Sequence, residues 1–399
     1  MSRRIVLFCG GRGSATIIRA LLRQSEVELT LLINAYDDGL STGTLRNFIP
    51  GMLGPSDFRK NLSYLFGDYS GDYSGDYSGD YSRAALQSLM EYRLSGAAGE
   101  IEKLAGFAAG PALADQPLKD WFAQLPQDVL NRIRGLLARF FGYAADAHFD
   151  YRDCALGNLV FAGAYLEQSE DFNAAAAAMA ALVDSRAKLF NVSEPQNRVL
   201  VGLKRDGTLL ASEAAIVGPQ SISPITDLYL LEQPLAAAAL EALAELDTIG
   251  KQAWLSARDA VPKLSSAAAE ALAGADIILY GPGTQHSSPF PSYRIARTAL
   301  EESPAPVKAL VINLESDNDI QDLSAGDIVD GALHYGAKVS HILLDENCLL
   351  PPGALTAKSY RGARVARAPL SSAGSPRLHD GDAVSRLVTD LCGRSREKS

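Results

Sequence analysis

The sequence predicts an α/β protein with a mainly parallel sheet, because apolar strand-like segments alternate with a helical segment near the start and reappear late in the chain. Residues 5–9 are wholly apolar and end in a glycine-rich turn, and residues 15–23 then carry apolar side chains at helical spacing. A second apolar segment, 29–35, completes a strand–helix–strand unit, which predicts parallel strands. Segments 277–280 and 307–312 are short apolar strands of the buried parallel type, so the same pattern resumes there.

The middle of the chain interrupts this pattern. Residues 67–82 read Gly-Asp-Tyr-Ser four times in tandem, and a turn former and a charge in every copy predict an exposed loop. A tyrosine-rich binding or modification segment is the alternative interpretation. The apolar spacing of residues 83–152 is helical and predicts a helical insert, whereas segments 199–203 and 209–210, joined by Lys-Arg-Asp-Gly, predict an added antiparallel β-hairpin.

These patterns divide the chain into consecutive parts. The last part is rich in Pro, Gly, Ser and Arg up to a helical segment at 382–391, which predicts a partly mobile tail with a terminal helix. The expected parts are the first piece of the α/β core at 1–66, the repeat loop at 67–82, the helical insert at 83–152, the remainder of the core at 153–350 and the tail at 351–399.

The composition excludes several classes of protein. A formal net charge of -10 over 399 residues and a pI near 5.1 argue against a non-specific hold on nucleic acid, which needs clustered basic side chains. The 4 cysteines form no CxxC pair, so neither a zinc knuckle nor a disulfide framework is indicated. The apolar segment at 5–9 is too short for a signal peptide or a membrane span. We therefore expect a cytoplasmic protein without a membrane or nucleic-acid partner.

The first candidate site is the loop that joins the first strand to the first helix. It reads Gly10-Gly11-Arg12-Gly13-Ser14, and glycines there let the backbone approach a phosphate while the first amide groups of the helix point at it. Thr16 stands where a dinucleotide fingerprint has its third glycine, and no Lys-Ser pair of a P-loop follows. A purely structural turn remains the alternative.

Two acidic residues follow the second strand. A dinucleotide-binding enzyme has one acidic residue there for the ribose, whereas this chain has both Asp37 and Asp38. Ser41 and Thr42 come directly after them, so carboxylates and phosphate donors would meet at one strand end, which suits Mg²⁺ bridging a carboxylate and a phosphate. Turn formation and helix capping are the alternative roles for these residues.

A third segment, Pro55 to Asn61, predicts a helix start. Asp57 lies near its N-cap, a position where Asp is often structural. Arg59 is a candidate for binding phosphate oxygens with its guanidinium, and Asn61 for contacting a base or ribose. The sequence leaves both alternatives open.

The loop after strand 277–280 is the most distinctive element. It is rich in glycines and hydroxyls, and Asn313, Asp317 and Asp319 follow the next strand, so the two loops should flank one crevice at the same sheet edge. For His286 we favour a hydrogen-bonded loop residue over a proton-transfer role. The candidates for phosphate binding at this edge are Gly281, Gly283, Thr284, His286, Ser287, Ser288 and Asn313.

Taken together these segments resemble the CofD/YvcK superfamily, which includes 2-phospho-L-lactate transferase and a gluconeogenesis-factor branch that binds nucleotide sugars. The resemblance covers most of the chain. Four positions depart from the family pattern: Arg12 replaces Thr, Leu40 replaces a second Gly, Lys60 replaces Asn, and His286 replaces Tyr. The matching segments are GGRGSATIIRALL, NAYDDGLSTGTLRN, GPSDFRKNLSYL, ALGNLVFAGAYL and ILYGPGTQHSSPFPS, followed by Val311-Ile312-Asn313.

This resemblance implies a Rossmann-like three-layer α/β/α fold, a homodimer, and a GDP- or UDP-type nucleotide diphosphate conjugate as ligand. In the transferase branch, Mg²⁺ assists an alcohol acceptor that attacks the phosphate carrying the lactyl group. The resemblance assigns metal binding or alcohol activation to Asp37 and Asp38, and orientation of the conjugate to Asn61 and Asn158. Phosphate binding falls to Gly11, Gly13, Gly281, Gly283, Thr284, Ser287 and Ser288.

Two other functions compete with the transferase. A YvcK-like regulator of carbon metabolism or the cell envelope would bind a UDP-sugar without turning it over, and the Asp-Asp-Gly and Gly-Pro-Gly segments resemble that branch more closely. An NAD(P)-dependent oxidoreductase would use Asp37 in the ribose position, although the missing third glycine of the first loop argues against it. The sequence leaves the base, the acceptor and the occurrence of turnover undetermined.

Overall fold

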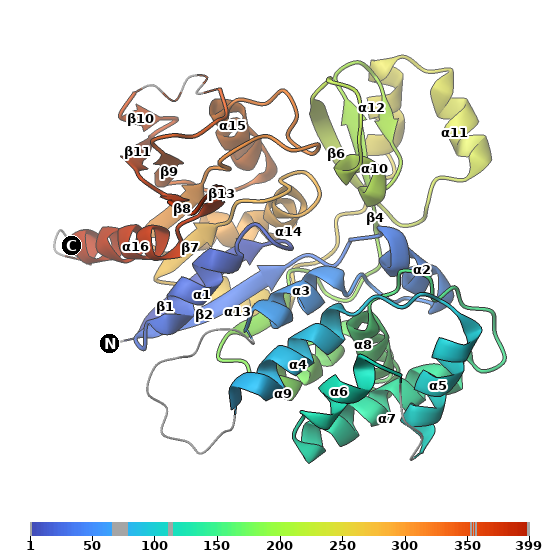
Figure 1. The fold of residues 1–399 in the computed structure, drawn as a ribbon. Coiled ribbons are helices and arrows are strands. Elements are labelled where there is room, and N and C mark those ends of the chain that lie inside the picture. Colours follow the sequence, from blue (N-terminus) through green and yellow to red (C-terminus); the bar gives the residue numbers. More distant parts are fainter. Residues whose placement is uncertain are drawn as a thin grey trace. The chain divides into compact units, whose positions relative to one another are not determined.

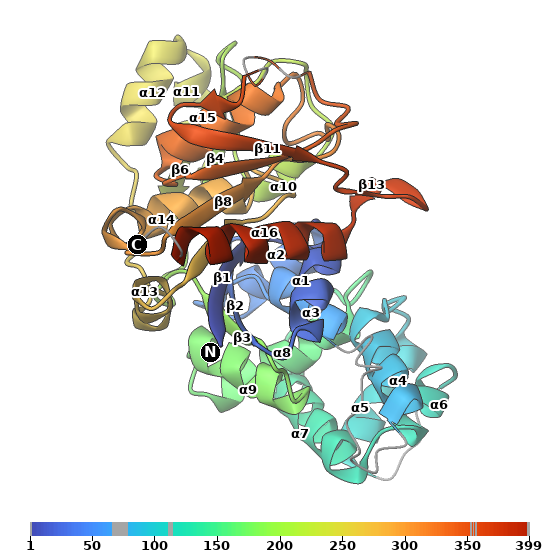
Figure 2. The same cartoon turned by 90° about the vertical axis from the view of Figure 1, so that its left-hand side faces the viewer.

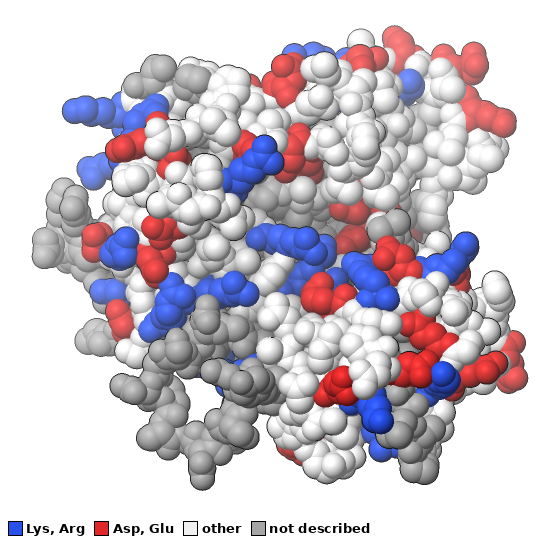
Figure 3. All heavy atoms as spheres, in the orientation of Figure 1, with Lys and Arg blue, Asp and Glu red and all other residues white. Residues whose placement is uncertain are grey.

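The computed structural model describes residues 2–65, 79–110, 115–351, 353, 355 and 357–396 (Figure 1). Two compact units divide the chain, and we call Met1–Tyr36 with Phe190–Ser399 the sheet unit and Asp37–Leu189 the helical unit. In the described ranges no helix is long and apolar enough to cross a membrane. On the face shown in Figure 3, basic side chains are mixed with acidic ones.

The centre of the sheet unit is a mostly parallel sheet. Within the described residues it has eight strands in the order β10-β11-β9-β8-β7-β1-β2-β3. Each of the pairs β1–β2, β1–β7, β7–β8, β8–β9 and β9–β11 is parallel, and β10 runs antiparallel to β11. The strands are β1 (Arg3–Cys9), β2 (Val27–Ile33), β3 (Lys188–Asn191), β7 (Ile277–Tyr280), β8 (Val307–Val311), β9 (His341–Asp345), β10 (Ser359–Tyr360) and β11 (Ala363–Ala368).

The order of the strands reverses at β1. Ile5 of β1 pairs with Leu29 of β2 on one side and with Ile277 of β7 on the other. In open α/β sheets, ligands bind outside the carboxyl ends of the strands at such a switch point. The loops that follow β1 and β7 therefore lie where this architecture places a binding crevice.

Two groups of helices cover the sheet. Figures 1 and 2 show α1 (Ala15–Arg23) and α16 (Gly381–Arg396) on one face, and α13 (Ser266–Ala273), α14 (Pro289–Glu302) and α15 (Ala325–Tyr335) on the other.

Specific contacts hold each helical layer together. In the first layer, Arg23 pairs with Asp382 at 2.6 Å. In the second layer, the rings of Phe290 and Tyr335 stack with their centroids 5.2 Å apart. The predicted Rossmann-like α/β/α fold with a mainly parallel sheet is confirmed.

The predicted hairpin is present in the sheet unit as part of a small antiparallel sheet, β5-β4-β6. Leu210 pairs with Gly202, and Gly207 in the connecting turn has a φ of 83°, which glycine adopts without strain. Val201 and Leu255 belong to the buried cluster beneath this sheet. The elements are β4 (Val199–Lys204), β5 (Leu209–Leu210), β6 (Ile225–Leu231), α10 (Glu213–Val217), α11 (Ala237–Ala244) and α12 (Thr248–Ser256).

The tail contains more regular structure than its composition suggests. β11 extends the main sheet, where Val365 pairs with Ile342 of β9, and β12 (Ser371–Ser372) and β13 (Ser375–His379) then form a separate antiparallel pair. Short strands between turn formers give little periodic signal, so the sequence pattern did not reveal them. The predicted terminal helix is confirmed as α16.

In its described residues, the helical unit consists mainly of α-helices that pack around an aromatic core. Phe48, Phe140 and Phe149 pack edge to face in its core, with Phe48 and Phe149 centroids 4.9 Å apart. The helices are α2 (Leu40–Phe48), α3 (Ser56–Leu65), α4 (Gly79–Glu91), α5 (Ala98–Ala109), α6 (Leu118–Ala123), α7 (Gln127–Ala144), α8 (Leu156–Glu167) and α9 (Phe172–Leu182).

The repeat loop was predicted over 67–82. This prediction is wrong for its last copy, because helix α4 begins at Gly79. The buried side chains Leu86, Leu89 and Met90 anchor the rest of this helix, and a packed helix extends through adjacent residues of modest propensity. Residues 67–78 lie outside the described part of the chain.

A glycine on α8 makes the close packing of α7 and α8 possible. A Cβ at Gly163 would lie 2.0 Å from the Leu136 carbonyl oxygen, so we expect Gly163→Ala to destabilise the protein by about 1–3 kcal/mol. Denaturant unfolding measures this change. Gly135→Ala on α7 is the matched control, because a Cβ there meets nothing within 4 Å and should be neutral or stabilising. Equal unfolding free energies for the two variants would contradict the prediction.

Candidate functional site

The two glycine loops of the sheet unit contact each other through their backbones. A Cβ at Gly13 would lie 2.7 Å from the carbonyl oxygen of Pro282 and 2.8 Å from Cα of Gly283. A Cβ at Gly281 would lie 2.5 Å from Oγ of Ser14. A side chain larger than glycine would therefore clash on both sides of this contact.

The N-terminus of α1 opens onto this contact. Ser14 is the N-cap, but its side chain makes no capping hydrogen bond; its Oγ instead donates to the carbonyl oxygen of Pro282 at 3.5 Å. The first turn of α1 contains no acidic residue. Amide groups in the first turn of a helix lack partners within the helix and attract anions. This end of α1 can therefore receive a phosphate.

A buried carboxylate fixes the second loop. Asp319 Oδ1 accepts the backbone amide of His286 at 2.8 Å, and its Oδ2 accepts that of Ser287 at 2.9 Å. These bonds join the loop after β7 to the segment after β8. Because Asp319 accepts these two amides, they are not available to an anionic ligand. The position of Asp319 at this edge was predicted, whereas its bonds to the loop amides were not.

His286 is held as a structural residue. Its Nδ1 lies 2.8 Å from the backbone carbonyl oxygen of Asp319, to which it donates. The ring packs edge-on against Phe290, with centroids 5.1 Å apart. This geometry agrees with the favoured interpretation of a hydrogen-bonded loop residue.

Amide side chains complete the support of the loop. Asn313 Nδ2 donates to the Gly283 carbonyl at 2.9 Å, and Gln285 Nε2 donates to Asn313 Oδ1 at 2.9 Å. Asn34, at the end of β2, donates to the carbonyls of Ser287 and Ser288 at 3.1 Å each. Asn34 and Gln285 were not predicted. Their only signal in the sequence is a polar residue at a strand end or inside a glycine-rich loop.

Some buried polar atoms here have no partner in the described chain. These atoms include Ser288 Oγ and Gln285 Oε1. Buried polar atoms normally form hydrogen bonds, so such atoms commonly indicate a position that a ligand or water completes. They support the assignment of Ser288 to a binding surface.

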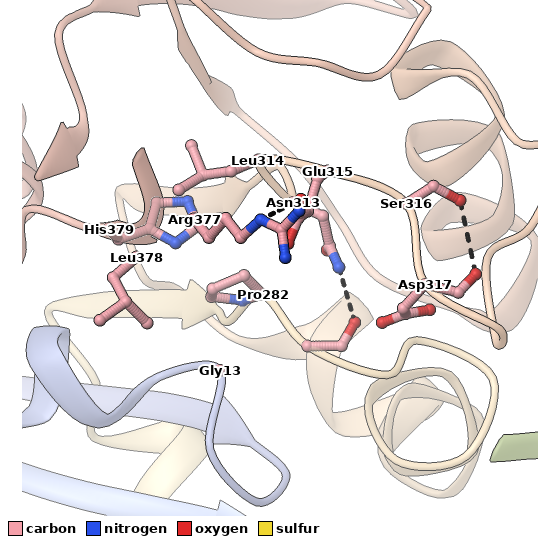
Figure 4. Close-up of a pocket in the computed structure, with 11 residues that line it drawn as sticks. Gly13, Pro282, Asn313, Leu314, Glu315, Ser316, Asp317, Arg377, Leu378 and His379 are labelled. Atoms are coloured by element: carbon pink, nitrogen blue, oxygen red, sulfur yellow. Dashed lines mark hydrogen bonds and ion pairs between the residues drawn. The ribbon is translucent and has the colours of Figure 1, made fainter. Parts of the chain in front are cut away.

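A cavity of about 170 Å³ lies beside the glycine loops (Figure 4). Its lining comes from three places in the sheet unit: the glycine loops, the segment after β8, and β13. The lining residues are Gly13, Pro282, Gly283, Asn313, Leu314, Glu315, Ser316, Asp317, Arg377, Leu378 and His379.

The predicted acidic pair lies in the helical unit, at the start of α2. Asp37 Oδ1 accepts the amide of Gly39 at 2.9 Å, and Arg46 donates to the Asp37 carbonyl at 3.0 Å. Burial, and after it the nearby charge of Asp57, together raise the pKa of Asp37 from its ordinary value of 3.8 to about 6. Asp57 is paired with Lys60 at 3.0 Å. The structure thus brings Asp37 and Asp57 together as one acidic cluster, with the ammonium group of Lys60 beside it.

A second set of predicted residues forms a buried network in the helical unit. Asn158 Oδ1 accepts Arg59 Nε at 2.9 Å, while its Nδ2 donates to Ser56 at 3.2 Å and to Ser41 at 3.5 Å. Ser56 also bonds to Thr42. Asn158 therefore links α2, α3 and α8.

The Arg59 side chain bonds mainly to other side chains of the protein. Its side chain is 1% exposed, and it forms an ion pair with Glu91 in addition to its bond to Asn158. Its Nη2 is buried and has no hydrogen-bond partner among the described residues. Asn61, predicted to orient the conjugate, donates to the Asp57 carbonyl at 2.8 Å. These contacts give Arg59 and Asn61 a supporting position beneath the acidic cluster.

Whether the acidic residues fit Mg²⁺ depends on the oxygens that a bound substrate adds to the metal site. Among the described residues, no group of three or more His, Cys, Asp or Glu side chains is arranged to hold a metal ion. Mg²⁺ commonly binds through one or two carboxylates, with waters and substrate phosphates as its other ligands. Asp37 and Asp38 fit such a partial set, in which phosphate oxygens would complete the shell.

Comparisons with known proteins agree with the sequence motifs. The family model described as 2-phospho-L-lactate transferase CofD matches residues 5–363. Two solved structures of protein BH3568 from Bacillus halodurans, a UPF0052 family member, superpose with TM-scores of 0.65 and 0.64 at 18% and 19% identity. They cover 97% and 98% of this chain, and 100% of their own chains are covered. No curated protein matches this chain.

Proposed function

Because the chain belongs to the 2-phospho-L-lactate transferase CofD family, we propose that it transfers a phosphorus-containing group from a nucleotide diphosphate conjugate to an alcohol. The contact between Gly13 and the Pro282–Gly283 backbone carries this proposal, because it joins two glycine loops at the sheet's switch point. The conjugate would be of the GDP or UDP type, and the active protein would be a homodimer.

The glycine loops would hold the diphosphate. The α1 N-terminus offers amide groups and a favourable helix dipole. In the second loop the hydroxyl groups of Thr284 and Ser287 bond to each other at 2.8 Å, and the buried Ser288 Oγ has no hydrogen-bond partner among the described residues. Phosphoryl transfer depends mainly on positioning and on neutralising charge as it develops. A rigid loop, held by Asp319 and Asn313, supplies this positioning without reorganisation during the reaction.

The acidic cluster would act on the acceptor. Asp37 has a pKa of about 6 because it is buried beside Asp57, so near neutral pH it is ionised and basic enough to accept an alcohol proton. Mg²⁺ held by Asp37 and Asp38 would neutralise phosphate charge when bound. Attack by the alcohol oxygen on phosphorus would break the bond to the nucleoside monophosphate, which leaves with the bonding electron pair.

A ligand panel tests this proposal. We expect GDP or UDP conjugates to raise the melting temperature, with a larger shift when Mg²⁺ is present, and NAD and NADP to have no effect. Incubation with an alcohol acceptor such as a deazaflavin should then release a nucleoside monophosphate. Absence of any nucleotide-dependent shift would contradict the proposal.

The same panel separates the transferase from a non-catalytic regulator. Lys60 stands where the resemblance expects Asn, and it pairs with Asp57 in the acidic cluster, which favours a changed role for this site. A regulator would bind a UDP-sugar tightly and leave it unconsumed after prolonged incubation with acceptor and Mg²⁺. Release of UMP or GMP would exclude that function.

A further inference from the structure

The cavity of Figure 4 has two chemically different ends. Pro282, Leu314 and Leu378 lie at one end of the view, and Ser316 and Asp317 lie at the other. The apolar side chains come from three separate elements, namely the loop after β7, the segment after β8, and β13. Three apolar and six polar or charged residues of the described chain line the cavity, so it offers apolar contact to a planar ring together with groups that can fix its orientation.

Hydrogen bonds hold both ends of the β12–β13 segment, which lines one side of the cavity. Asp345 accepts the amides of Leu370 and Ser371 at 2.6 and 2.7 Å, where β12 begins. At the other end of β13, His379 Nε2 donates to the Ile312 carbonyl at 3.1 Å. Burial lowers the pKa of His379, so its ring stays neutral at physiological pH. This wall of the cavity is therefore preformed.

Two exposed side chains of β13 occupy positions that a ligand would cover. Leu378 is 52% exposed although it lines the cavity. The side chain of Arg377 is 77% exposed, and its Nε lies 3.2 Å from Glu315 Oε2 (Figure 4). Covering the leucine gains hydrophobic free energy, and a guanidinium plane stacks well on a heterocycle.

We propose that Arg377, Leu378 and Pro282 form the binding wall for the heterocyclic base of the nucleotide conjugate, with Arg377 as the specificity-determining residue. Gly13 and Gly283, the phosphate loops, border the same cavity, so a base joined to the diphosphate through its ribose would enter this space. The family match ends at residue 363, so residues 377–379 lie beyond it. This inference rests on the proposed function.

Calorimetric titration of GDP, UDP and inorganic pyrophosphate tests the base-binding wall. Arg377→Ala removes the proposed stacking partner of the base, so it should lower the affinity for the preferred nucleoside diphosphate about fivefold or more. Its affinity for pyrophosphate should stay within about twofold of wild type. Leu378→Ser should have a smaller effect in the same direction.

The control is Arg364→Ala, an exposed arginine on β11 that does not line the cavity. It should bind all three ligands as wild type does. A parallel loss of pyrophosphate affinity in Arg377→Ala, or an unchanged nucleotide affinity, would overturn the base-binding wall while leaving the proposed function intact. Wild-type protein that binds no nucleoside diphosphate would overturn both.

Discussion

Asp37→Asn is expected to abolish group transfer while making the folded protein more stable at neutral pH. The loss of activity should be at least about a hundredfold, because the variant lacks both the proposed proton acceptor and a metal ligand. The gain in stability follows from burial, which makes the ionised carboxylate of Asp37 unfavourable beside Asp57. Turnover assays and denaturant unfolding in the absence of metal measure the two effects.

The contribution of Asp37 to the stability of the folded protein should decrease as the pH rises. The folded pKa of Asp37, about 6, lies above its ordinary value of 3.8, so between these values the folded protein binds a proton that the unfolded chain does not. Stability therefore falls as pH rises through this window and stays lower above it. Asp37→Asn should be about 1–2 kcal/mol more stable than wild type at pH 7 and nearly equal below about pH 4.

Asp146→Asn is the matched control for this experiment, since Asp146 is exposed in the turn after α7. It should change neither activity nor the pH profile. A variant at Asp37 that retains full turnover and metal dependence would refute the role assigned to that carboxylate. A variant that is inactive but destabilised at pH 7 would refute the electrostatic account of its burial.

Gly13→Ala is expected to weaken nucleotide binding by about tenfold to a hundredfold. The added Cβ would lie 2.7 Å from the Pro282 carbonyl oxygen and 2.8 Å from Gly283 Cα, and both are backbone atoms that cannot rotate away. The two loops must therefore separate, and amide groups that share one diphosphate would lose their common geometry. Titration with nucleoside diphosphate and with pyrophosphate should show the same loss for both ligands.

Gly99→Ala provides the comparison, because a Cβ at this position of α5 meets nothing within 4 Å. Its binding should equal that of wild type. The loss in Gly13→Ala should exceed what its destabilisation explains, so both variants need to be shown folded at the assay temperature. Normal affinity in a folded Gly13→Ala protein would mean that the contact between the loops does not position the phosphate.

The sequence was most informative where local pattern and position in the sheet agree. The segment at 5–9 and the helix at 15–23 are found as β1 and α1, and the segment at 277–280 is found as β7. Glycine-rich loops after these strands could be located because apolar strands end abruptly there. The strand order that places β1 between β2 and β7 was not predictable, since it depends on pairing between residues about 270 positions apart.

The supporting residues of the site were harder to predict. Asp319 was recognised as lying at the right edge, but its two bonds to the loop amides depend on the conformation of that loop. Arg59 was predicted to bind phosphate, whereas it pairs with Glu91 and Asn158, two residues distant in sequence. β13 gave no signal because it has five residues and alternates weakly, yet it supplies one wall of the cavity.

The central place of β1 also shapes how the chain folds during synthesis. Its second neighbour, β7, begins at Ile277, so one edge of β1 stays unpaired until most of the chain has left the ribosome. At roughly 5–20 residues per second this wait lasts on the order of ten seconds to a minute. An apolar strand with an open edge can pair with other chains during that time. Nascent protein should therefore depend on a holding chaperone until the C-terminal half emerges.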